Sequence, residues 1–191
     1  LPGSGTDKVF SINDLSDYRR FRSSLKGKKR ILIMGAGLIG CEFANDLKIG
    51  GYDVDVVAPS ETALTGLLPL EAGSAVAEGL TAAGVRFHFS RVVSQIDSSL
   101  EGVISTLDDG TVIESDIVIS AVGLKPRTVL AKQAGLEVEH GILVSRALET
   151  SERDIFALGD CAEVDGKVLL YVLPLMACAR ALAKTICGER T

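Results

Sequence analysis

The glycine-rich segment Gly35-Ala-Gly37-Leu-Ile-Gly40 limits the possible fold of this chain more than any other feature. The apolar run 29–34 leads directly into it, and Leu38–Ile49 follows with helical periodicity. In a strand–turn–helix unit of this kind, the first glycine permits a tight turn and the second lets a pyrophosphate approach the backbone. The third lets helix and strand pack closely.

The segment therefore predicts a dinucleotide-binding loop, because free N–H groups at a helix start favour negative charge. The alternative is a plain strand–turn–helix unit without a ligand. The residues predicted to touch the dinucleotide here are Gly35, Gly37, Leu38, Ile39 and Gly40.

The rest of the chain alternates strand and helix patterns, which predicts an α/β fold with a Rossmann-like parallel sheet and helices on both faces. Three short strands between residues 92 and 114, with a turn at Asp109-Gly110, predict an antiparallel β-meander in place of a helical crossover. Further helices are expected at 15–25, 71–83, 128–134 and 175–186, and further strands at 52–58, 85–89, 116–121, 142–144 and 155–158.

The end of the strand 52–58 bears on which nucleotide is bound. A carboxylate there would bond the ribose 2′-OH of NAD, whereas an arginine would hold the 2′-phosphate of NADP. Ala58 occupies the usual acidic position, and Glu61 lies three residues further along and is expected to replace it. No arginine or lysine occurs between Tyr52 and Val85, so the sequence favours NAD(H).

Composition excludes several other functions. The net charge of −5 and an aromatic content of 5% argue against nucleic acid as a partner. The longest apolar stretch, 168–179, is shorter than the roughly 20 residues of a membrane span. Four scattered cysteines and two histidines offer no zinc-ligand spacing, and such thiols favour a reducing, cytoplasmic compartment. No Ser-His-Asp or Cys-His pattern predicts a catalytic side chain.

Three segments together resemble one known family. GAGLIGCEFA at 35–44 resembles the NAD signature of the FAD-dependent pyridine nucleotide–disulfide oxidoreductases. The segment 120–126, SAVGLKP, is similar to the family's A-T-G-x-x-P motif, although Ser-Ala-Val replaces the usual residues. Thr150-Ser151 with the run 155–160, IFALGD, is similar to its second FAD motif.

This resemblance implies roles for matching residues. Glu42 is expected near the nicotinamide, and Val122 and Gly123 are expected to approach the bound NAD(H). In an intact family member, Gly159 and Asp160 would contact the FAD ribityl chain, and Met176 would face the flavin edge. The chemistry implied is hydride transfer from NADH to FAD, with the protein supplying position and electrostatics.

The resemblance also implies that the chain, which opens on Leu-Pro-Gly, is part of a longer flavoprotein. We expect a lead-in segment at 1–27, an NAD(H)-binding domain at 28–148 and part of an FAD domain at 149–191. The family's first FAD-binding glycine loop does not occur in these residues, so we expect that the chain does not retain FAD.

Within the family, the segments 9–14, 57–61 and 158–183 most resemble bacterial rubredoxin reductases. That branch implies NADH as donor and an electron-carrier protein such as rubredoxin as acceptor. The alternatives are an NADH-dependent ferredoxin reductase, an NADH oxidase or a non-catalytic NAD(H)-binding module.

Overall fold

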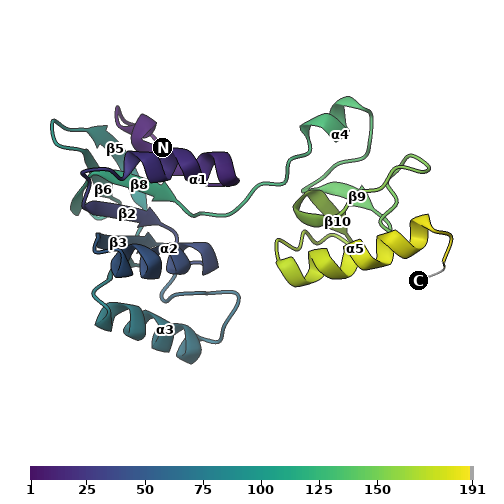
Figure 1. The fold of residues 1–191 in the computed structure, drawn as a ribbon. Coiled ribbons are helices and arrows are strands. Elements are labelled where there is room, and N and C mark those ends of the chain that lie inside the picture. The colour runs from purple at the N-terminus through teal and green to yellow at the C-terminus, as the bar shows by residue number, and fades with distance from the viewer. Residues whose placement is uncertain (190–191) are drawn as a thin grey trace. The chain divides into compact units, whose positions relative to one another are not determined.

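The computed structural model describes residues 1–189, which divide into two compact units. The first unit is Leu1–Gly123 and the second begins at Leu124. Figure 1 shows both units, and each is described by itself below. The boundaries predicted after Gly27 and after Leu148 concern the domains of a longer protein, and they stay predictions.

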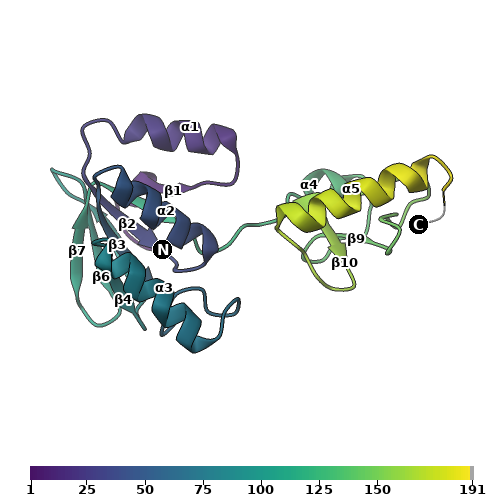
Figure 2. The ribbon, with the colours of Figure 1, turned by 60° about the horizontal axis from the view of Figure 1, so that its bottom comes forward.

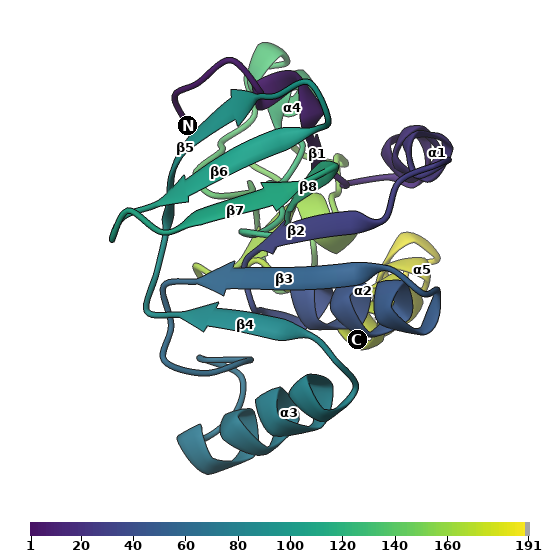
Figure 3. The same cartoon turned by 90° about the vertical axis from the view of Figure 1, so that its left-hand side faces the viewer.

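The first unit is built on a five-stranded parallel sheet with the order β1-β8-β2-β3-β4. Figure 3 shows β2, β3 and β4 side by side and pointing the same way. Val9–Ser11 was not predicted as a strand, and it adds an edge to the sheet by pairing with a segment more than 100 residues away. The strands are β1 (Val9–Ser11), β2 (Arg30–Met34), β3 (Asp53–Ala58), β4 (Arg86–Phe89) and β8 (Ile117–Ser120).

Three helices cover one face of this sheet: α1 (Leu15–Ser24), α2 (Leu38–Ile49) and α3 (Leu70–Ala82). Alternate strand residues, including Ile31, Ile33 and Val56, pack with Phe21 of α1 and Ala44 of α2. The α3 helix packs through Ala77 in a neighbouring cluster that includes Phe87 and Phe89 of β4. All three helices lie on the same side of the sheet in Figure 2.

An antiparallel meander covers the other face and consists of β5 (Val93–Ser98), β6 (Val103–Leu107) and β7 (Val112–Ser115). Its apolar residues Ile96, Val103 and Leu107 pack against Leu32 and Val118 of the sheet. The predicted α/β fold with a parallel sheet and a meander is therefore confirmed. One detail differs: α1, α2 and α3 share one face, because the meander occupies the face where a second helical layer was expected.

The second unit contains α4 (Val129–Gln133), the parallel strands β9 (Ile142–Val144) and β10 (Ala162–Val164), and α5 (Val172–Ile186). The α5 helix begins three residues before the predicted start at Leu175. Pro174 fits into its first turn because the N–H groups there have no partner within the helix. The predicted strand at 155–158 is limited to one isolated bridge, between Glu149 and Phe156.

Asp116 ties the start of β8 to the start of β2. Its Oδ2 accepts hydrogen bonds from the backbone N–H groups of Lys29 (2.7 Å) and Arg30 (2.8 Å), and its Oδ1 accepts one from the Arg30 guanidinium at 3.1 Å. Burial alone would raise the pKa of Asp116, but these donors hold it below its usual value. The ionised carboxylate is therefore the form that stabilises the sheet.

We predict that Asp116→Asn lowers the free energy of unfolding at pH 7 by about 1–2 kcal/mol, because hydrogen bonds to a charged acceptor are lost. The pKa is lower in the folded state, so this contribution is present above pH ~4 and is lost as the pH falls through the folded-state pKa. Urea unfolding of both proteins from pH 7 to pH 3 measures it. The side chain of exposed Glu78 forms no hydrogen bond among the described residues, and Glu78→Gln is the control. A constant difference between Asp116→Asn and the parent across that range would contradict the account.

Candidate functional site

The strand order has a switch point between β2 and β8, at the carboxyl edge of the sheet. From β2 the chain continues to β3 and β4 on one side, and it later returns to β8 on the other side of β2. In open parallel sheets, ligands bind outside the carboxyl ends of the two strands that flank such a switch point. The segments that follow these strands are 35–40 after β2 and 121–123 after β8.

Gly35 and Gly40 hold these segments in close contact. Gly35 has a φ of +106°, and a Cβ atom there would lie 2.5 Å from the Ala121 carbonyl oxygen. A Cβ atom at Gly40 would lie 2.0 Å from the Gly35 carbonyl oxygen. Neither position accepts a side chain without backbone movement, so both glycines are required by packing.

Gly37 differs from these two glycines, because a Cβ atom there would meet no other atom within 4 Å. It is exposed and caps α2, whose first N–H groups have no partner within the helix. Leu38 and Ile39 follow with 40% and 38% exposure. The loop therefore offers open space and N–H donors to an anionic group, as a pyrophosphate requires.

The other residues predicted to contact NAD(H) flank this loop. Glu42 is exposed on α2, and its side chain forms no hydrogen bond or ion pair within the described residues. Val122 is 74% exposed, and Gly123 has a φ of +122° with open space around it. Cys41, next to Glu42, is buried, and burial followed by the nearby Glu42 charge raises the pKa of its thiol. Cys41 is therefore unsuited to act as a redox thiolate.

The end of β3, where the ribose was expected, carries no carboxylate on the strand itself. Ala58 is 1% exposed, while Glu61 is exposed in the loop that follows. The structure adds Arg91, which the sequence analysis missed because it lies 33 residues after Ala58. The Arg91 backbone N–H donates to the Ala58 carbonyl oxygen at 3.1 Å.

The residues assigned to FAD lie in the second unit. Gly159 has a φ of +81°, and a Cβ atom there would lie 3.2 Å from Leu175 Cδ1 of α5. Asp160 follows in a short 3-10 helix (Gly159–Cys161) and is exposed. Met176, in α5, is 42% exposed. The turn at Gly159 thus packs against the helix that carries Met176.

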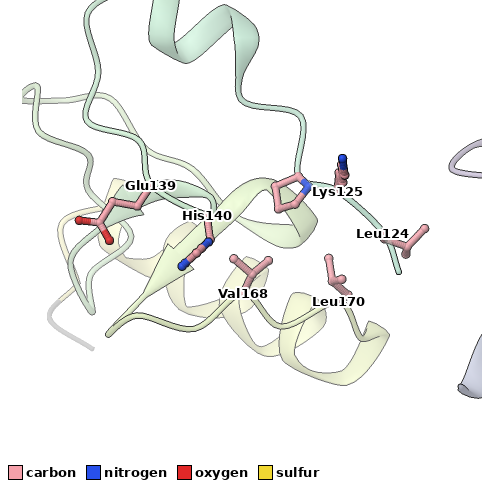
Figure 4. A pocket seen from close by; sticks show the side chains of 7 residues that line it. Leu124, Lys125, Glu139, His140, Val168 and Leu170 are labelled. Carbon is pink, nitrogen blue, oxygen red and sulfur yellow. The ribbon is translucent and has the colours of Figure 1, made fainter. Parts of the chain in front are cut away.

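A cavity of about 480 Å³ also lies in the second unit, and it includes none of the predicted site residues. Val168 and Leu170 line it between His140 and Leu124 (Figure 4).

Among residues 1–189, no helix is long and apolar enough to cross a membrane. The same residues contain no cluster of His, Cys, Asp and Glu side chains suited to a metal ion.

Comparisons with known proteins agree with these motifs. Residues 1–182 match the family model described as pyridine nucleotide-disulphide oxidoreductase. The chain is 53% identical to a rubredoxin-NAD(+) reductase of Alcanivorax borkumensis and 46% identical to one of Acinetobacter baylyi. Each alignment covers 100% of this chain and 50% of the relative.

A crystal structure of a ferredoxin reductase from Rhodopseudomonas palustris superposes with a TM-score of 0.91 at 28% identity, over 100% of this chain and 50% of the other. The chain therefore spans about half the length of these relatives. The family model covers most of the chain, and the resemblance predicted from the motifs is confirmed. The chain belongs to the pyridine nucleotide-disulphide oxidoreductase family.

Proposed function

We propose that the first unit binds NAD(H) at the carboxyl edge of its sheet. The observation that carries this proposal is the contrast among the three glycines of one loop. Gly35 and Gly40 are required by backbone packing, whereas Gly37 faces open space at the start of α2. That space, beside the exposed Val122 and Gly123, suits a pyrophosphate with the nicotinamide extending toward Glu42.

The preferred nucleotide is NADH in this proposal. Glu61 is exposed beyond the end of β3 and is the carboxylate available to a ribose 2′-OH. The β3 strand and the loop after it contain no arginine or lysine. A 2′-phosphate would therefore meet a carboxylate rather than a cation in that loop.

The longer protein to which this chain is expected to belong is proposed to be an NADH-dependent flavoprotein that passes electrons to a carrier such as rubredoxin. The names of two relatives, at 53% and 46% identity, support this assignment. FAD would supply the step that accepts hydride from NADH and passes electrons on. Gly159, Asp160 and Met176 would contact FAD from the second unit. Asp160 is exposed and free of ion pairs within residues 1–189, which fits a residue that bonds to a cofactor.

Two alternatives remain. A related NADH-dependent ferredoxin reductase or NADH oxidase would use the same nucleotide loop with another acceptor, and a solved ferredoxin reductase shares the fold. A non-catalytic NAD(H)-binding module would need no FAD contacts, so the turn at Gly159-Asp160 favours an enzyme.

The compartment proposed for this protein is the reducing cytoplasm. All four cysteines are free thiols, which fits that proposal.

Calorimetric titration of the full 191-residue chain with NADH tests the proposed site. We expect Gly37→Val to weaken NADH binding by at least about tenfold, because the new side chain fills the space reserved for the pyrophosphate. The fold should remain, since a Cβ atom at this position meets no neighbour within 4 Å. Circular dichroism verifies that both proteins are folded.

Gly79→Val is the matched control. Gly79 is also exposed and a Cβ atom there also meets nothing within 4 Å, but it lies near the carboxyl end of α3, away from the nucleotide loop. Its NADH affinity should equal that of the parent. Equal NADH affinity for Gly37→Val and Gly79→Val would exclude the proposed site, and so would an absence of NADH binding by the folded parent.

We further expect the purified chain to carry no flavin, because it supplies one part of the proposed FAD contacts and lacks the family's first FAD-binding glycine loop. The absorption spectrum of the protein between 350 and 500 nm measures this, with protein refolded in excess FAD and then desalted as the second sample. Stoichiometric flavin in either sample would contradict the expectation.

A further inference from the structure

Arg91 lies directly beside the end of β3. The Ser90 backbone N–H donates to the Ser60 carbonyl oxygen at 3.0 Å, and the Arg91 backbone N–H donates to the Ala58 carbonyl oxygen at 3.1 Å. These two hydrogen bonds extend the pairing of β3 and β4 beyond Phe89. They bring the backbone of Arg91 to the strand end at which a dinucleotide's adenosine ribose is recognised.

The Arg91 side chain is held by a carboxylate from another part of the fold. Its Nε donates to Asp109 Oδ2 at 2.5 Å, and its Nη1 donates to the Ser90 carbonyl oxygen at 2.7 Å. Arg91 and Asp109 side chains are 41% and 36% exposed, so the pair lies at the surface and is accessible to a ligand. The Nη2 group has no hydrogen-bond partner among the described residues.

Asp109 lies in the turn between β6 and β7, and this turn is fixed close to Arg91. Asp109 Oδ1 accepts from the Thr111 backbone N–H at 2.9 Å. The neighbouring Asp108 is joined to Val92 in both directions, through its backbone N–H (3.0 Å) and its Oδ1 (3.2 Å). In Figure 3 this turn lies at the left of the view, at the edge where β3 and β4 have their carboxyl ends.

We propose that Asp109 is a specificity-determining residue that holds Arg91 in an ion pair and so withholds it from the 2′-phosphate of NADPH. This inference rests on the proposed NAD(H) site. An arginine near the ribose is the group that binds a 2′-phosphate, and guanidinium–phosphate contacts are among the strongest that a protein forms. With Asp109 in place, the Arg91–Asp109 pair has no net charge, and the Asp109 carboxylate repels the negatively charged 2′-phosphate.

The ion pair persists throughout the physiological pH range. Backbone and side-chain hydrogen bonds from Thr111, followed by the bond from Arg91, lower the pKa of Asp109 to about 2. Asp109 is therefore ionised at every pH at which dinucleotide binding would be measured. The charge of Asp109 does not change between pH 6 and pH 8, so substitution is the way to test its role.

The test is calorimetric titration of the full chain and its variants with NADH and, separately, with NADPH, at low ionic strength. We expect Asp109→Asn to raise the NADPH-to-NADH affinity ratio by at least about tenfold, because the freed guanidinium gains a charge-assisted bond to the phosphate. The gain should shrink as salt is added, since the new contact lies at the surface. Thermal unfolding of each variant verifies that it is folded.

Two further variants separate the proposed cause from a general charge effect. Asp108→Asn removes the same charge one residue away, from a side chain that bonds Val92 rather than Arg91, and it should leave the ratio unchanged. In the double variant Asp109→Asn with Arg91→Ala, the gain should disappear, because the phosphate ligand is gone.

An unchanged ratio in folded Asp109→Asn that still binds NADH would overturn this inference and leave the NAD(H) site intact. The inference would also be overturned if the double variant kept the raised NADPH-to-NADH affinity ratio, because Arg91 would then not be the phosphate ligand. An equal rise in Asp108→Asn would overturn it too, because general repulsion between the carboxylates and the phosphate would then explain the preference. A parent chain that binds neither dinucleotide would overturn the NAD(H) site, and the inference about Asp109 would fall with it.

Discussion

The close backbone contact within the segment 35–40, and between it and Ala121, determines where a ligand can reach the carboxyl edge of the sheet. Gly40 lies against the Gly35 carbonyl, and Gly35 lies against the Ala121 carbonyl, with no room for a Cβ atom at either glycine. This contact sets the start of α2 directly over the ends of β2 and β8, where the strand order reverses. Gly37 is then left as the open position at which a phosphate could meet free N–H groups.

Features that depend on neighbouring residues could be predicted from the sequence. The strand 30–34, the glycine loop and the helix 38–49 follow from local periodicity and from the backbone freedom of glycine. The meander was predictable because Asp109-Gly110 marks a tight turn between short strands, and Gly110 does adopt a φ of +85°. The candidate nucleotide loop could be located for the same reason, since its residues are consecutive.

Features that depend on distant partners could not be predicted. The β1 strand has three residues and exists because β8 pairs with it, and the helices share one face because the meander fills the other. Arg91 reaches the end of β3 through strand pairing, and its partner Asp109 comes from a separate hairpin. His88 lies 2.9 Å from a carboxylate oxygen of buried Asp55, whose second partner is Arg86. No spacing rule in the sequence reveals such contacts.

The most direct test of the central claim is amide chemical-shift mapping of the isotope-labelled chain during titration with NADH, because it reports where the dinucleotide binds. The account predicts the largest shifts at residues 35–42, with further shifts at 58–61 and 122–123. Shifts confined to the second unit, or no shifts at any NADH concentration that calorimetry finds saturating, would contradict binding at the switch point between β2 and β8.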